Sequence, residues 1–67
     1  MKDIQEIMKD FMDDYEENPE GWNYWTEKSG EFYDIYILND DEGYFMKIDS
    51  IYTQNPIGKG TKIKIEQ

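Results

Sequence analysis

The chain has 67 residues and carries 16 acidic side chains against seven basic ones, so its formal net charge is −9 at pH 7. It contains no cysteine and no histidine, which excludes disulfide bonds and cysteine-bound zinc and removes the commonest general base and metal ligand. The length predicts one small domain, residues 1–67, and no apolar run approaches the roughly 18 residues that a transmembrane helix needs.

The first segment with a clear period runs from Asp3 to Glu17. Its apolar residues recur every three or four positions, as on one side of an α-helix, and they are Ile4, Ile7, Met8, Phe11, Met12 and Tyr15. Asp3 suits an N-cap, with Glu6 as its capping-box partner, and Pro19 disfavours helical geometry in the residue before it. We therefore predict a helix over about residues 3–17 that buries one side.

After Pro19 the apolar period changes to two, which is typical of strands. The predicted strands cover residues 22–26, 31–38, 44–52 and 61–66, with turns at Glu27–Gly30 and Asn39–Gly43. We predict an α+β fold in which one N-terminal amphipathic helix packs on a roughly four-stranded antiparallel meander sheet. The expected core joins Ile7, Met8, Phe11 and Tyr15 to Tyr33 or Phe32, Ile35, Ile37, Met46, Ile48, Ile63 and Ile65.

The negative charge is concentrated in the first two thirds of the chain. Residues 1–49 carry 15 acidic residues and four lysines, whereas residues 50–67 carry three lysines and Glu66. Such a surface repels phosphates and anionic lipid headgroups, so we expect neither direct nucleic acid binding nor membrane binding. A basic protein surface is the partner that this charge favours. The N-terminus lacks the pattern of a secretory signal, and we therefore expect a cytoplasmic protein.

The side of the predicted helix opposite the apolar stripe carries a row of carboxylates, which is the main candidate site. Its members are Asp3, Glu6, Asp10, Asp13, Asp14 and Glu17. Like-charged residues lie four positions apart, and Asp13, Asp14, Glu16 and Glu17 oppose the dipole at the helix C-terminus, at a total cost of about 1–2 kcal/mol. Unfavourable local choices of this kind occur at functional surfaces. A solvated face that keeps the chain soluble and a weak cation-binding face are the alternatives.

A second acidic cluster, Asp40, Asp41 and Glu42, occupies the predicted turn between the second and third strands. It resembles a calcium loop only in composition, because the acids are consecutive and the loop is too short. The simpler interpretation is a polar hairpin tip. If this tip lies near the end of the helix, the two clusters form one negative surface, which Glu20 extends.

An aromatic run, Trp22, Tyr24 and Trp25, lies in the first predicted strand. Side chains alternate along a strand, so Trp22 and Tyr24 share one side and Trp25 takes the other. Either one tryptophan anchors a partner beside the acidic surface, or both belong to the core. Stacking on nucleic acid is disfavoured because the charges around the run are Glu17, Glu20, Glu27 and Glu31.

The sequence holds no motif for catalysis or for a cofactor. The segment Gly58-Lys59-Gly60-Thr61 is not a phosphate-binding loop, because Thr53 stands where the first glycine is needed and Gly60 separates the lysine from the threonine. The carboxylates are expected on a helix exterior and a turn rather than in a cleft. We therefore expect no enzyme activity, no metal site and no cofactor.

In size, acidity and lack of arginine, the chain resembles the phage-encoded DNA mimics, a class that includes inhibitors of CRISPR nucleases, restriction enzymes and uracil-DNA glycosylase. The abundance of Ile, Tyr, Asn, Lys, Asp and Glu also fits a phage or mobile element of a low-GC bacterial host. The resemblance implies an inhibitor that presents carboxylates where a nucleic-acid-binding protein holds phosphates. The implied partner-binding residues are Glu6, Asp10, Asp13, Asp14, Glu17, Glu20, Trp22, Trp25, Asp40, Asp41 and Glu42.

Two other functions stay open. A structural or assembly protein would homo-oligomerise, or add a strand to a partner, through an exposed sheet edge, unless Lys62 and Lys64 guard that edge. An accessory subunit of a transcription or replication complex would use the same acidic surface with a different partner.

Overall fold

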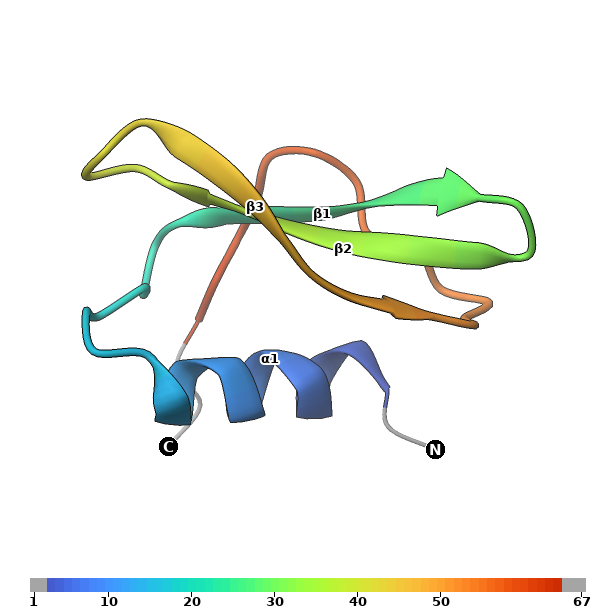
Figure 1. The fold of residues 1–67 in the computed structure, drawn as a ribbon, viewed down its shortest axis with the longest axis horizontal. Coiled ribbons are helices and arrows are strands. Elements are labelled where there is room, and N and C mark those ends of the chain that lie inside the picture. The colour runs from blue at the N-terminus through green and yellow to red at the C-terminus, as the bar shows by residue number, and fades with distance from the viewer. Residues whose placement is uncertain (1–2, 65–67) are drawn as a thin grey trace.

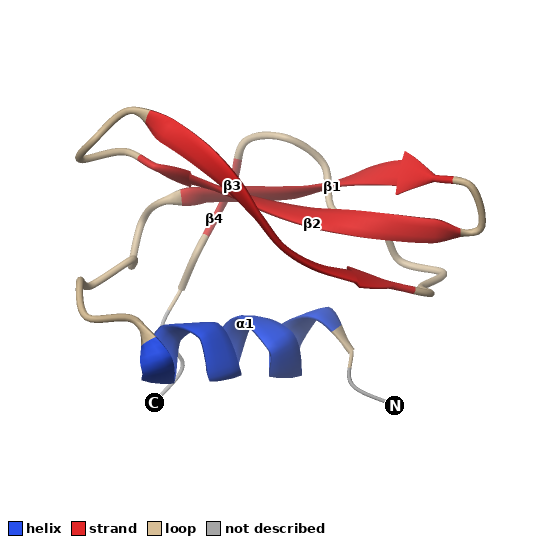
Figure 2. Cartoon of the chain, in the orientation of Figure 1, coloured by secondary structure: helices blue, strands red, loops and turns tan. Residues whose placement is uncertain are grey.

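The computed structural model describes residues 3–64, and the last two residues of the predicted fourth strand, Ile65 and Glu66, lie outside them. Its elements are α1 (Ile4–Asp14), β1 (Asn23–Ser29), β2 (Phe32–Asn39), β3 (Tyr44–Ile51) and β4 (Thr61–Lys62). The strands form one antiparallel sheet, and α1 lies along one of its faces (Figure 1, Figure 2). The predicted α+β fold with an N-terminal helix is confirmed.

The strand order is β3-β2-β1-β4, so only the first three strands follow one another as a meander. β4 pairs with β1, where Asn23 lies opposite Lys62. The chain reaches that edge through the segment after β3, which is hydrogen-bonded to the middle of β1. The Thr26 amide donates to the Ile57 carbonyl over 2.9 Å, and the Ile57 amide donates to the Thr26 hydroxyl over 2.9 Å. The last strand therefore closes the edge of the first strand rather than extending the meander beyond β3.

The helix begins as predicted but ends three residues early. Asp3 is its N-cap, and the carboxylate accepts a hydrogen bond of 2.9 Å from the Glu6 amide. After Asp14 the backbone of Tyr15 is extended, with φ −87° and ψ 132°. This conformation turns the Tyr15 ring inward, where it stacks on Phe11 at 4.8 Å and meets Trp22 edge-on at 5.6 Å between ring centroids. Ring packing thus ends the helix before Pro19 can do so.

The end of β1 also differs from the prediction, and β3 contains an irregularity that was not predicted. β1 continues to Ser29, since Gly30, with φ 64°, occupies the first position of a two-residue turn and lets Ser29 pair with Phe32. Glu27 and Lys28 are therefore strand residues and not turn residues. In β3 the register against β2 shifts between Ile35 and Tyr36, which is a β-bulge.

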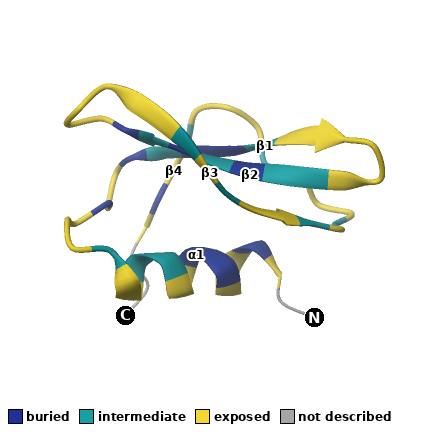
Figure 3. Cartoon of the chain, viewed as in Figure 1, coloured by how far each residue is buried: buried dark blue, intermediate teal, exposed yellow. Residues whose placement is uncertain are grey.

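The core lies between α1 and the central strands (Figure 3). Ile35 and Ile37 of β2 are completely buried. The buried cluster consists of Ile4, Ile7, Met8, Trp22, Tyr24, Ile35, Ile37 and Ile63, with Phe11, Met12, Tyr15, Met46, Ile48, Ile51 and Ile57 packed against it. We call the side of the sheet under α1 the covered face and the opposite side the outer face.

Candidate functional site

The carboxylates of α1 are exposed, as the helical period predicts. Ile4, Ile7 and Met8 are buried against the sheet, which leaves Glu6, Asp10, Asp13 and Asp14 exposed on the remaining helix surface. Glu17 and Glu20 are also exposed, in the segment between α1 and β1. The early end of the helix corrects one expectation: only Asp13 and Asp14 stand in the last helical turn, while Glu16 and Glu17 lie beyond it.

The turn that carries Asp40, Asp41 and Glu42 is built by Asn39. The Asn39 side chain is only 1% exposed, and its Oδ1 accepts hydrogen bonds of 3.0 Å from the amides of both Asp41 and Glu42. Gly43 closes the turn with φ 78° and donates its amide to the Asn39 carbonyl over 2.7 Å. The three acidic side chains of the turn are exposed and point away from a rigid base.

The structure places the acidic turn and the end of the helix at the same end of the molecule (Figure 1). Tyr15, the first residue after α1, has its side chain near that of Tyr44, the first residue of β3. The Tyr44 hydroxyl is the main reason why the pKa of the Tyr15 hydroxyl is raised above its ordinary value of 10.0; desolvation and the charge of Glu17 add to the rise, and the Asn39 side chain opposes it. The acidic turn therefore lies near the end of the helix, as one negative surface made of the turn and the helix carboxylates requires.

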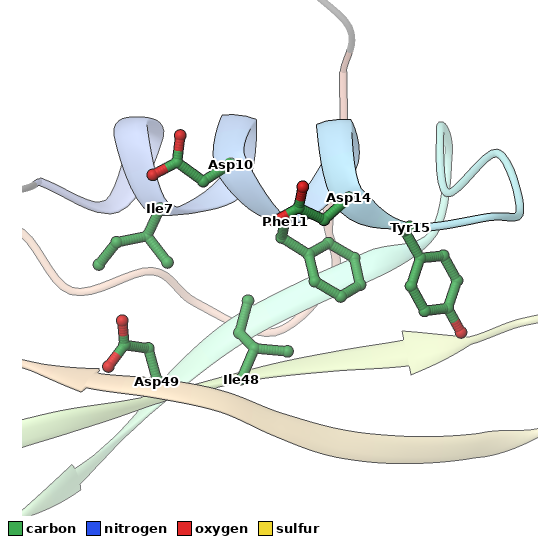
Figure 4. Close-up of a pocket in the computed structure, with 7 residues that line it drawn as sticks. All are labelled: Ile7, Asp10, Phe11, Asp14, Tyr15, Ile48 and Asp49. Atoms are coloured by element: carbon green, nitrogen blue, oxygen red, sulfur yellow. The ribbon is translucent and has the colours of Figure 1, made fainter.

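A groove runs between α1 and β3 beside these carboxylates (Figure 4). Its lining combines apolar side chains with three carboxylates and comprises Ile7, Asp10, Phe11, Asp14, Tyr15, Ile48 and Asp49. Asp49 comes from β3 and points toward the helix, because the bulge pairs Asp49 with Ile35 on the covered face directly after Ile48. Sequence alternation assigned Asp49 to the other side of the strand, and the groove was therefore not predicted.

The two tryptophans lie on opposite sides of the sheet. Trp22 is 4% exposed and belongs to the core, where its ring meets Tyr15. This burial fits the alternative in which Trp22 belongs to the core, while its assignment as a partner-binding residue stays a prediction. Trp25 is 9% exposed but is not part of the cluster under α1. It pairs with Tyr36 of β2 on the outer face.

An aromatic cluster covers part of the outer face, and we name it by its rings, Trp25, Tyr36 and Phe45. The rings of Trp25 and Tyr36 are stacked at 5.8 Å between centroids, and Phe45 contacts both at 6.1 and 5.9 Å. Lys59 places its Nζ 5.8 Å from the Trp25 ring centroid, and the Trp25 Nε1 donates to the Glu27 carboxylate over 3.2 Å. Phe45 is 62% exposed.

Sequence reasoning missed this cluster apart from Trp25. A signal was present, since β2 carries apolar residues at every position from Ile35 to Leu38. In a strand with one face against a helix and the other in water, apolar and polar residues should alternate. A run of apolar residues instead indicates a strand that is buried on both faces. One helix can cover only one of those faces.

Within residues 3–64, no group of three or more acidic side chains is arranged to hold a metal ion. In the same range, no helix is both long and apolar enough to cross a lipid bilayer. Comparison of the chain with protein-family models, with curated proteins and with solved structures finds no match.

Proposed function

We propose that this protein binds a basic protein surface through its carboxylates and inhibits a nucleic-acid-binding protein, such as a CRISPR or other defence nuclease, by occupying the place of DNA. The observation that carries the proposal is that the acidic turn lies at the same end of the molecule as the C-terminus of α1, from which the carboxylates continue along the helix (Figure 1). The acidic surface consists of Glu6, Asp10, Asp13, Asp14, Glu17, Glu20, Asp40, Asp41 and Glu42, all exposed.

The spacing of charge along the helix supports a phosphate-like role. Five carboxylates occur from Asp3 to Asp14. At a rise of about 1.5 Å per residue, these 12 residues place one carboxylate every ~3.6 Å along the axis. One strand of B-DNA carries a phosphate about every 3.4 Å along its axis. Lys9 is the one basic residue in this stretch and reduces its negative charge from −5 to −4.

The groove between α1 and β3 suits the side chain of a partner's lysine or arginine. Such a side chain has an apolar stem and a charged head. Ile7, Phe11 and Ile48 offer the apolar contact, and Asp14 and Asp49 offer carboxylates on both sides of the groove. A basic side chain inserted there would lose water from its stem while its charge stays paired.

The test measures inhibition of a panel of purified enzymes: DNA cleavage by a CRISPR nuclease and a restriction endonuclease, and uracil excision by uracil-DNA glycosylase. For an enzyme that the protein inhibits, the fourfold variant Asp10→Asn, Asp13→Asn, Asp14→Asn, Glu17→Gln should lose inhibition by at least about tenfold, since several charge pairs are removed. Affinity for the wild-type protein should fall with added salt, mainly through a slower association rate.

A charge-conserving variant of the same four positions is the matched control. Asp10→Glu, Asp13→Glu, Asp14→Glu and Glu17→Asp keep the net charge and should retain most of the inhibition. The neutral variant should be folded and at least as stable as wild type, because like-charge repulsion along the helix and at its C-terminus is relieved. Undiminished inhibition by the neutral variant, or inhibition of no enzyme in the panel, would contradict the proposal.

A further inference from the structure

The outer face of the sheet differs from the rest of the molecule in both polarity and charge. It carries the aromatic cluster and Leu38, which lies opposite Phe45 in the sheet register. The cluster borders a depression that is lined by Asn23, Trp25, Glu27, Leu38, Phe45, Lys59 and Gly60. A protruding ring and a partly apolar hollow therefore lie side by side on one face.

Charges of both signs surround this cluster. By the strand register and the ring contacts, the outer face carries Lys47, Lys59 and Lys62 together with Glu27 and Asp34. Lys47 lies 4.0 Å from Asp34, which also accepts a hydrogen bond from the Ser50 hydroxyl. The outer face thus has a surplus of one positive charge on a chain of net charge −9. It is the face on which two copies of the chain repel each other least.

The ring geometry argues against stacked nucleobases as the occupant. Proteins that bind single strands offer the open faces of aromatic rings to the bases. Here Tyr36 stacks on the Trp25 ring with an angle of 16° between the planes, and Lys59 lies over the same ring. The Trp25 faces are already used inside the protein. Of the three rings in the cluster, Phe45 is the one left exposed to a partner, and it favours an apolar contact of the kind found at protein interfaces.

We propose that two copies of this chain associate through their outer faces in a symmetric dimer. In a two-fold arrangement the same patch meets itself, so Phe45 of each copy can enter the depression of the other. Lysines on one face then meet Glu27 and Asp34 of the second copy, and the two helices point away from each other. The carboxylates of α1 stand on the far sides of both sheets, beyond the ~8 Å over which salt at physiological strength screens charge. The acidic turn, which follows Leu38 and precedes Phe45, lies at the end of the sheet beside the interface.

The size of the face predicts a weak dimer. The sheet extends along the longest and the shortest dimension of the molecule, 31 and 17 Å, with α1 stacked along the third (Figure 1). That footprint is below the ~800 Å² that each partner contributes to a standard interface. We therefore expect dissociation constants in the range of about 10 μM to 1 mM.

The test is sedimentation equilibrium of the full chain over about 10 μM to 1 mM protein, the range expected for a weak complex. The apparent mass should rise with concentration from 8.1 kDa toward twice that value. Added salt should strengthen the dimer, because it screens the repulsion between two chains of charge −9. The proposed binding of a basic partner has the opposite salt dependence, so the two proposals can fail separately.

Phe45→Lys should keep the chain monomeric over the whole range, with an unchanged circular dichroism spectrum. Tyr52→Lys is the matched control, since Tyr52 is 56% exposed but follows the end of β3. A mass of one chain at every concentration and salt level would overturn the proposal, as would a dimer that is insensitive to Phe45→Lys. A monomer that binds oligothymidylate through Phe45 would also overturn it and would assign the outer face to single-stranded nucleic acid.

Discussion

Neighbouring residues of β2 show how differently the two faces of the sheet are built. Ile35 and Ile37 are completely buried under α1, in contact with aliphatic and aromatic side chains from every element of the core. Tyr36 and Leu38, the next residues along the same strand, face outward, where neighbouring side chains of the sheet and the segment around Lys59 cover them in part. The covered face is stabilised by burial under a helix. The outer face is stabilised by rings that pack against each other and leaves apolar surface for a partner.

The largest difference in stability between the two faces is expected when the adjacent residues Ile37 and Leu38 are each truncated to alanine. Ile37→Ala removes buried methyl groups and should cost about 2–5 kcal/mol, which is much of the ~3–10 kcal/mol expected for a domain of this size. Leu38→Ala should cost about 1 kcal/mol in dilute solution, since its surroundings are partly solvent. Urea unfolding followed by tryptophan fluorescence measures both. Equal losses at low protein concentration would show that the outer face is as well covered as the inner one.

A smaller difference in lost stability is expected between two polar side chains, Asn39 on the covered face and Ser50 on the outer face. Asn39 is buried and holds two amides of the acidic turn, so Asn39→Ala should cost about 1–3 kcal/mol. Ser50 donates to Asp34 on the exposed outer face, and Ser50→Ala should stay within about 0.5 kcal/mol. For a domain of 60–100 residues, 1 kcal/mol corresponds to a change in Tm of about 4–8 °C. A larger fall in Tm for Ser50→Ala than for Asn39→Ala would reverse the contrast.

The smallest effect concerns pH and the junction between the helix and β3. The pKa of Tyr15 is raised in the folded protein, so the folded state holds this proton more tightly than the unfolded state. The corresponding stability is fully present below pH 10 and is lost as pH rises through the folded pKa. Tyr15→Phe should remove this part of the alkaline decline, whereas Tyr52→Phe should not. Denaturant unfolding at pH 8 to 11 (a window about the ordinary tyrosine pKa) measures it; parallel declines of wild type and Tyr15→Phe would contradict the assignment.

Local pattern was sufficient to predict the helix, the first three strands and the exposure of the helix carboxylates. The N-cap at Asp3, the left-handed Gly43 and the inward residues Ile35 and Ile37 all follow from spacing over a few positions. The end of the helix did not, because it depends on a contact between Tyr15 and Trp22 that forms only when the chain turns back. The bulge left a trace in the sequence, since Ile48 and Ile51 both pack on the core and are three residues apart.

In the candidate site, too, some features follow from local sequence pattern and others depend on contacts between distant segments. That Glu6, Asp10, Asp13 and Asp14 are exposed follows from the helical period alone. Their nearness to the acidic turn depends on the direction in which α1 crosses the sheet, which brings Tyr15 near Tyr44. The aromatic cluster needs the register that pairs Trp25 with Tyr36 and Leu38 with Phe45. Register and crossing direction are set by contacts between distant segments, which no local window contains.

The two ends of the described chain both lie on the helix side of the sheet (Figure 1). Asp3 and Lys64 line the same depression along α1, together with Met8 and Met12. A tag or a surface tether attached at either end therefore starts on the helix side, among the carboxylates, and leaves the outer face open to solvent. The turn of Gly30 and Glu31 joins β1 and β2 at the end of the sheet away from the acidic turn, and a label there would leave the helix unobstructed. The point of attachment decides which of the two surfaces an immobilised protein can present.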